Sequence, residues 1–241
     1  MATVMNHRPS VHEPAADPLP LENGDHLDQP TFHRLYEAMP AGFKCELIGG
    51  IAYVMASPLK FAHSFSHIFA NNWLFSYFAA TPGTFPTDNA THIFSSNSEL
   101  QPDATLFVLP EFGGSSRIGD NGYIFGSPEL ALEIASSSKA IDLGAKKIDY
   151  EKAGVREYVV VLTQEKRVRW FTRQGKKFAT LAPGADGIFR SLVFPGLWLA
   201  PEGLTKGDNA QLREVLVEGL ASAEHAAFVE KLKAARTASS N

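Results

Sequence analysis

Two acidic residues and one lysine stand in segments of this chain that otherwise look like hydrophobic core. Asp103 is at the head of one apolar run, and Glu133 lies inside another, between Leu132 and Ile134. Lys146 follows, early in a predicted helix. A charged side chain inside a core strand is costly unless it is paired or binds a metal. Two carboxylates from adjacent strands, with an ammonium group nearby, suit a hard divalent cation and phosphate oxygens.

Each of these residues also has a purely structural interpretation. Asp103 could cap a turn after Pro102. Glu133 could form a buried ion pair with Lys146 and bind no metal. Asp142 fits the N-cap of the predicted helix and stands one turn before Lys146, so these two could pair as well. The residue types alone leave these alternatives open.

The order of the motifs resembles a known superfamily. A Pro-Asp pair at 102–103, then Glu133 within a strand, then Lys146 is similar to the PD-(D/E)XK nucleases. More narrowly, two segments resemble the Uma-two family of restriction endonucleases. They are residues 127–138 (SPELALEIASSS) and 142–158 (DLGAKKIDYEKAGVREY).

Earlier in the chain, residues 46–58 (ELIGGIAYVMASP), followed by His63, resemble that family's opening hairpin and first core helix. The resemblance covers residues 32–201, which is most of the chain. One departure concerns the lysine. In the written motif Glu-x-Lys it would stand at position 135, where this chain has Ala135. The family tolerates this by supplying the lysine from the next helix, where Lys146 matches.

The resemblance implies a fold and an activity. The fold is α/β, with a restriction-endonuclease-like mixed central β-sheet flanked by helices, an antiparallel strand extension and a C-terminal helical segment. The activity is phosphodiester hydrolysis by an endonuclease that uses Mg²⁺ or Mn²⁺. The expected substrate is nucleic acid, with DNA favoured over RNA, and a homodimer is expected because two strands need two sites or two turnovers.

Specific roles follow from the same resemblance. Asp103 and Glu133 would chelate the metal, with the backbone carbonyl of Ile134 as a third oxygen ligand. Lys146 would hold the attacking water or neutralise charge that grows on the phosphate oxygens. Glu46, in the first strand of the hairpin, would reach the metal through water or accept a proton.

Three further residues are candidate substrate contacts. His63 stands at the head of the first core helix, so we expect it near the phosphate, with capping or packing as its alternative role. Ser136 and Ser138 could bind phosphate where the next helix begins, and they are equally well explained as loop residues.

A different class of function stays open. The chain could be a catalytically inactive protein of the nuclease fold that serves as a nucleic-acid-binding or protein-interaction scaffold. The intact set of Asp103, Glu133 and Lys146 argues against this hypothesis, whereas the acidic N-terminus and the balanced charge elsewhere favour it. Residues 141–180 are an exception, with ten Lys or Arg against five Asp or Glu, and could steer a phosphate backbone.

Composition limits the remaining classes. The single cysteine, Cys45, cannot form an internal disulfide, and its surroundings show no zinc motif. The first thirty residues hold no apolar run typical of a secretory signal. No stretch approaches the roughly 20 apolar residues of a membrane span. We therefore expect a cytoplasmic protein with no membrane contact.

We expect three segments: an unstructured acidic tail over residues 1–30, a nuclease-like domain over 31–201 and a helical extension over 202–241. Helices are predicted over residues 31–39, with Thr31 as cap, 62–79, 142–153 and 208–235, the last broken near Gly219. Strands are predicted over residues 84–94, 104–109, 130–135, 157–162, 168–172, 177–181 and 188–194, and a hairpin over 44–57 turning at Gly49-Gly50.

Overall fold

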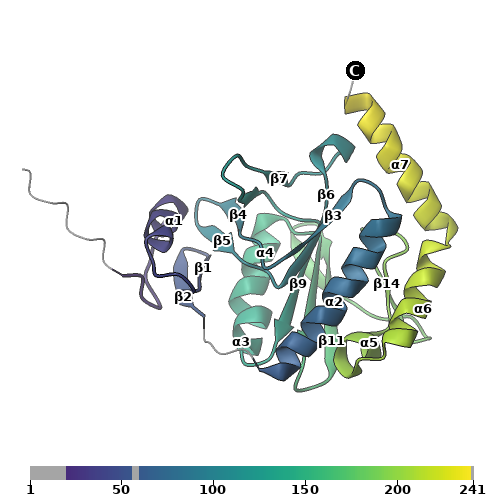
Figure 1. Ribbon diagram of the computed structural model, residues 1–241, viewed down its shortest axis with the longest axis horizontal. Coiled ribbons are helices and arrows are strands. Elements are labelled where there is room, and N and C mark those ends of the chain that lie inside the picture. Colours follow the sequence, from purple (N-terminus) through teal and green to yellow (C-terminus); the bar gives the residue numbers. More distant parts are fainter. Residues whose placement is uncertain (1–19, 56–59, 240–241) are drawn as a thin grey trace, which may run out of the picture.

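A six-stranded mixed sheet forms the centre of the molecule. The computed structural model describes residues 20–55 and 60–239. In the central sheet the strand order is β12-β11-β10-β9-β6-β3, and only the β9–β10 pair is parallel (Figure 1). The strands are β3 (Thr84–Asp88), β6 (Ala104–Val108), β9 (Leu130–Ala135), β10 (Glu157–Leu162), β11 (Arg167–Gln174) and β12 (Lys177–Leu181). The mixed central sheet expected from the sequence is confirmed.

Side-chain alternation along β9 gives the sheet two different faces. Leu130, Leu132 and Ile134 belong to the core cluster shared with α2 (Phe61–Ala80). Ala131 and Ala135 belong to a second cluster, built around the tyrosines of α4 and β10. Glu133 has the same parity as these alanines and therefore points toward α4 (Lys147–Ala153).

A smaller sheet stands beside the central one, in the order β2-β1-β5-β4-β8-β7. Its strands are β1 (Cys45–Ile48), β2 (Ile51–Val54), β4 (His92–Ser95), β5 (Ser98–Leu100), β7 (Arg117–Ile118) and β8 (Ile124–Phe125). The predicted hairpin is present, because Gly49 and Gly50 adopt positive φ angles of 60° and 85° between β1 and β2. The predicted strand over residues 84–94 is two strands, β3 and β4, which belong to different sheets.

Part of the expected acidic tail is folded. The backbone of Gly24 bonds to that of Ala52 at 2.8 Å, Leu21 is buried, and His26 pairs with Ile51 in an isolated β-bridge. The expectation of an unstructured segment over residues 1–30 is therefore wrong for residues 20–30, because these add apolar and backbone contacts to the hairpin. Residues 1–19 lie outside the described part of the chain.

The first helix, α1 (Gln29–Glu37), begins earlier than expected. Its cap is Asp28, whose Oδ1 accepts a hydrogen bond from the Thr31 backbone N–H at 2.9 Å. Thr31 is therefore a residue of the helix rather than its cap. The Asp28 carboxylate satisfies an N–H group that would otherwise be free at the start of the helix.

The helix after β9 also starts earlier than expected. It begins with α3 (Lys139–Ile141), passes through a π-helical turn η2 (Asp142–Lys146) and continues as α4 to Gly154, which is left-handed. Asp142 is therefore inside the helix and is not its N-cap. The π turn carries both Asp142 and Lys146 into the interior, where each is buried.

The C-terminal helices complete the main core. They are α5 (Pro201–Lys206), α6 (Asn209–Leu220) and α7 (Ala223–Ser239); α5 lies almost wholly within the expected helical extension but was not predicted as a separate helix. Leu204, Leu212 and Leu216 share a buried cluster with Trp73 of α2. Residues 202–239 therefore pack as part of the central unit, on the side of the sheet that α2 covers (Figure 1).

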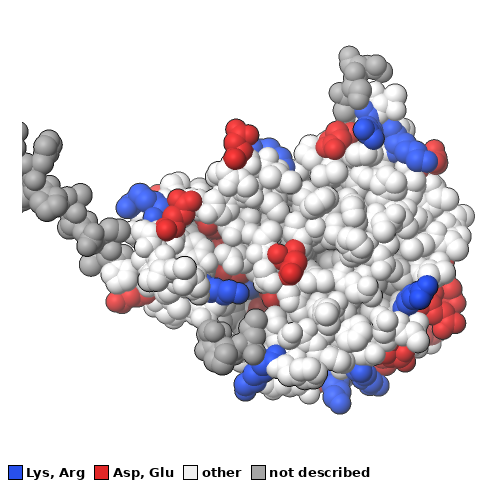
Figure 2. All heavy atoms as spheres, in the orientation of Figure 1, with Lys and Arg blue, Asp and Glu red and all other residues white. Residues whose placement is uncertain are grey.

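The remaining elements are short, and the surface over α2 carries little charge. A pair of strands, β13 (Phe189–Arg190) and β14 (Trp198–Leu199), replaces the predicted strand over 188–194, and a 3₁₀ turn, η1, covers Pro110–Phe112. Figure 2 shows that charged side chains lie mainly at the margins of the face that α2 crosses. Within the described residues no helix is both long enough and apolar enough to cross a bilayer.

Candidate active site

The ammonium group of Lys146 is the centre of a buried ionic cluster on the α4 face of the central sheet. Its Nζ lies 2.8 Å from Glu46 Oε2 and 2.9 Å from Glu133 Oε1. Asp142 Oδ1 is 4.0 Å away, one helical turn earlier. Three elements far apart in the sequence, β1, β9 and η2, therefore place these four charged side chains together. Each of them is at most 4% exposed.

The cluster keeps Lys146 positively charged. Burial by itself lowers the pKa of the ammonium group, but the carboxylates of Glu133, Glu46 and Asp142 outweigh burial and raise the net pKa above its ordinary value. Lys146 therefore supplies a fixed positive charge next to the carboxylate of Glu133.

Glu133 accepts two hydrogen bonds on the same oxygen. Lys146 Nζ donates to Oε1 at 2.9 Å and the Tyr150 hydroxyl donates to it at 2.7 Å. Burial raises the pKa of Glu133 well above its usual range, and the nearby charge of Asp103 adds to that shift, although Lys146 opposes it. In the described residues no hydrogen bond reaches the other oxygen, Oε2, which leaves it available to another partner.

Glu46 is held by the backbone just after β5 and by Lys146 of η2. Its Oε1 accepts a hydrogen bond from the backbone N–H of Gln101 at 2.8 Å, and it also accepts one from Lys146 at 3.1 Å. The hairpin therefore contributes one carboxylate to a cluster that the central sheet and its helix complete. Glu46 contacts Lys146, and a carboxylate at this position is a potential proton acceptor.

Asp103 lies at the start of β6, between α2 and β9. Its Oδ2 accepts a hydrogen bond from the backbone N–H of Ile134 at 2.6 Å, and its Oδ1 lies 3.2 Å from His63 Nε2. Burial raises the pKa of Asp103, but the hydrogen bond and charge of His63 and the Ile134 N–H together bring the net pKa below its ordinary value. Asp103 is therefore held as an ionised carboxylate.

Strand register brings the two expected metal ligands together. In the antiparallel β6–β9 pair Ala104 faces Leu132, so Asp103 stands opposite Glu133 one step further along. The N–H of Ile134 points at Asp103, and the carbonyl of a strand residue points to the same side as its N–H. Two carboxylates and one carbonyl therefore belong to neighbouring positions on β6 and β9, and oxygen ligands of this kind fit Mg²⁺ or Mn²⁺.

The protein supplies only part of a full coordination shell. Among the described residues no group of three or more His, Cys, Asp and Glu side chains is arranged to hold a metal ion. A cation bound by Asp103, Glu133 and the Ile134 carbonyl would take its remaining ligands from water and phosphate, as Mg²⁺ commonly does.

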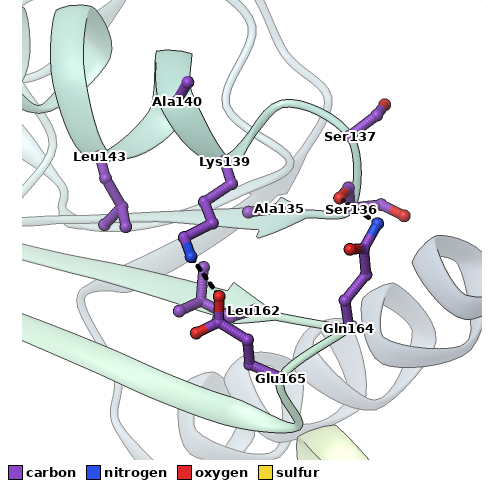
Figure 3. A pocket seen from close by; sticks show the side chains of 9 residues that line it. All are labelled: Ala135, Ser136, Ser137, Lys139, Ala140, Leu143, Leu162, Gln164 and Glu165. Carbon is purple, nitrogen blue, oxygen red and sulfur yellow. Dashed lines mark hydrogen bonds and ion pairs between the residues drawn. The ribbon is translucent and has the colours of Figure 1, made fainter.

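The candidate substrate contacts lie in different settings. His63 touches Asp103, and its other ring nitrogen, Nδ1, is buried without a hydrogen-bond partner. Ser138 donates its hydroxyl to Asp142 Oδ2 at 2.5 Å. Ser136 lines a pocket of about 430 Å³, and its carbonyl accepts a hydrogen bond from Gln164 (Figure 3). Their roles as substrate contacts stay predictions.

Sequence reasoning missed two members of the site. Tyr150 donates to Glu133, and it stands four residues after Lys146, a spacing that a helix places on one face. The spacing of four residues between Lys146 and Tyr150 could have identified Tyr150 from the sequence. Gln101 fixes Glu46 through its backbone N–H, which no side-chain pattern could reveal.

Comparison with known proteins places these features in a family. A family model named Uma2 and described as "Putative restriction endonuclease" matches residues 29–202. The chain is also similar to a crystal structure described as a putative nuclease belonging to DUF820 from Anabaena variabilis ATCC 29413. That similarity has a TM-score of 0.49 and 14% sequence identity, and covers 76% of this chain and 97% of that one. No curated protein matches the chain.

Proposed function

Since the chain belongs to the Uma2 family of restriction-endonuclease-like proteins, we propose that it is a metal-dependent endonuclease that hydrolyses phosphodiester bonds in DNA. The observation that carries this proposal is the convergence of Asp103 and Glu133 beside the ammonium group of Lys146. A purely structural ion pair would need Glu133 and Lys146 but would give Asp103 no reason to be held ionised next to them.

The proposed cofactor is Mg²⁺ or Mn²⁺, bound by Asp103, Glu133 and the carbonyl of Ile134. When bound, such a cation supplies positive charge that polarises a phosphate and makes water more acidic. Two features of the protein favour the binding of this cation. The protein keeps Asp103 ionised through His63, and it leaves Glu133 Oε2 without a hydrogen bond from the described residues.

Lys146 is the proposed catalytic cation. Its Nζ already sits within 2.9 Å of Glu133 and so reaches the position where a scissile phosphate would approach the carboxylates. An ammonium group there stabilises negative charge that develops on the phosphate oxygens. Glu46 also contacts Lys146 and is the proposed acceptor of a proton from the attacking water.

DNA as substrate and a homodimer as the active form belong to the same proposal. Both come from the chemistry of the family, in which cutting two strands requires two sites or two turnovers. Two exposed arginines near the start of β11, Arg167 and Arg169, offer positive charge on the central sheet.

A second candidate function is a scaffold of the nuclease fold without catalysis. The observation that favours it is the closed ionic cluster, in which Lys146 is neutralised by Glu46 and Glu133. If the cluster serves only to hold the fold together, the same fold is expected without catalysis.

One experiment separates the two. Purified protein is incubated with plasmid and with single-stranded DNA in Mg²⁺, Mn²⁺ or EDTA, beside Glu133→Gln. The matched control is Glu157→Gln, which removes a buried charge from the neighbouring strand, where Glu157 bonds to Ser191 and Leu192 instead. We expect metal-dependent cleavage that only Glu133→Gln abolishes. Wild-type protein that cleaves nothing in any metal supports the scaffold.

A further inference from the structure

A pocket beside the candidate active site has the composition of a nucleotide subsite. It occupies about 430 Å³ at the carboxyl ends of the parallel strands β9 and β10. Four apolar side chains contribute to its lining, namely Ala135, Ala140, Leu143 and Leu162. Polar side chains complete the lining: Lys139 and Glu165 face each other on one side, and Ser136, Ser137 and Gln164 lie on the other (Figure 3).

Two elements, β9 and η2, contribute residues both to the pocket and to the ionic cluster. Ala135 lies on the same face of β9 as Glu133, two residues further along, which is about 6.6 Å at 3.3 Å per residue. Leu143 follows Asp142, whose carboxylate is 4.0 Å from Lys146. Successive charges on one DNA strand are about 3.4 Å apart along the helix axis. A nucleotide one or two steps from the scissile phosphate would therefore reach the pocket.

Positive charge gathers at the rim of the pocket. Lys139 forms an ion pair with Glu165, and the side chains are 53% and 39% exposed. The hydrogen bond from Lys139 is the main cause that lowers the pKa of Glu165, and the charges of Arg167 and Arg169 add to it. Three cationic side chains therefore act on one carboxylate, and both arginines are exposed.

We propose that this pocket binds a phosphodiester group of DNA next to the scissile bond, with Lys139 as the phosphate contact. Glu165 occupies Lys139 while the pocket is empty and gives way when a phosphate arrives, because an exposed Lys–Glu pair is weak and easily exchanged. The apolar lining would accept the sugar of the same nucleotide. This inference rests on the proposed nuclease function and adds the place where flanking DNA is held.

The test measures DNA binding in EDTA, so that nothing is cleaved. Fluorescence anisotropy of a labelled duplex reports the binding over a NaCl series. Lys139→Ala should weaken binding by roughly three- to tenfold, and should lower the slope of log K against log salt by about 0.9, the value for one phosphate contact. Glu165→Gln should tighten binding, because it frees Lys139. The matched control is Lys176→Ala, in the exposed turn at the opposite end of β11, which removes the same charge.

Parallel plasmid cleavage separates this inference from the proposed function. If wild-type protein cleaves but Lys139→Ala and Lys176→Ala bind alike and Glu165→Gln changes nothing, the subsite is wrong and the nuclease stands. If the Lys139 and Glu165 effects occur without cleavage, the subsite stands and hydrolysis is wrong. Wild-type protein that neither binds nor cleaves overturns both. Thermal melts of each variant show that the fold is intact.

Discussion

His63 Nε2 lies 3.2 Å from Asp103 Oδ1, so the first core helix holds a carboxylate that stands at the start of a central strand. The imidazole is one of the causes that bring the pKa of Asp103 below its ordinary 3.8 despite burial. His63 is therefore a positioning residue for the proposed metal ligand, since it touches Asp103. The sequence had suggested a phosphate contact for it.

Replacing His63 should weaken metal binding without abolishing it. In His63→Gln the amide can still donate a hydrogen bond to Asp103 but carries no positive charge, so we expect metal affinity to fall less than in His63→Ala. Second ligand-shell partners typically contribute ten- to a hundredfold in metal affinity. Isothermal titration with Mn²⁺ measures the metal affinity of each protein. Equal affinity in wild type and His63→Ala would show that the contact is not used for metal.

Divalent metal should stabilise the folded protein through Asp103. Binding to the native state alone contributes about 2.7 kcal/mol at a hundredfold excess over Kd. Thermal melts in Mg²⁺, Mn²⁺ and EDTA should show a shift that Asp103→Asn removes. The matched control is Asp88→Asn, because Asp88 also contacts a histidine of α2, with Oδ1 2.9 Å from His67 Nε2, but is 59% exposed. A metal-dependent shift that persists in Asp103→Asn would place the metal elsewhere.

Lys146 and Lys147 should differ sharply when each is replaced by alanine. Loss of one cationic donor to developing phosphate charge typically costs about 2.7–4 kcal/mol, or roughly a hundred- to a thousandfold in rate. We expect that loss for Lys146→Ala only, because Lys147 lies over the Phe171 ring, with Nζ 4.5 Å from its centroid. Single-turnover cleavage measures both rates. Similar losses in the two variants would contradict the role given to Lys146.

Lys146→Ala also leaves two buried carboxylates unpaired, which typically costs about 3–5 kcal/mol of stability. A second variant therefore keeps the test informative. In Glu46→Gln/Lys146→Met the charge of one carboxylate is removed together with the ammonium group, so the fold should recover while cleavage stays lost. Glu46→Gln alone shows how much of that loss belongs to Glu46. Recovery of cleavage in this double variant would show that Lys146 acts only on stability.

The protein should become less stable as the pH rises, because Glu157 then ionises in a buried position. Burial raises its pKa to about 7 from the ordinary 4.5, although hydrogen bonds from Ser191 and Leu192 oppose burial. The folded state therefore binds a proton between pH 4.5 and about 7 that the unfolded chain has lost. The resulting stability is present below pH 4.5 and is lost as the pH rises through about 7.

Urea unfolding of wild type and Glu157→Gln between pH 4.5 and 8 tests this linkage. The variant has no ionisable group at position 157. Its free energy of unfolding should therefore fall less than that of the wild type over this pH range, by on the order of 2–3 kcal/mol. Asp142, with a pKa raised to about 6 by burial, adds a change of the same sign in both proteins. Parallel pH profiles for the two proteins would contradict the assignment to Glu157.

Local patterns in the sequence were sufficient for much of the secondary structure. The strands β9, β10 and β12 have the bounds that their apolar runs predicted, and the paired glycines at 49–50 turn the hairpin. A run of alternating or apolar residues and a glycine that tolerates positive φ act within a few residues of the chain. The early start of the helix at Lys139 was not predicted, because the helix follows three serines that looked like loop and its π turn contains Gly144.

The sequence by itself determined that Glu133 is a charged residue inside a core strand, with Asp103 and Lys146 in order around it. Only the tertiary structure decided that Glu46 reaches Lys146 across 100 positions, that His63 holds Asp103, and that residues 20–30 pack on the hairpin. The reason is physical. A strand or a turn is fixed by neighbours along the chain, whereas the partners of a buried charge depend on strand order and register, which the packing of the whole molecule selects.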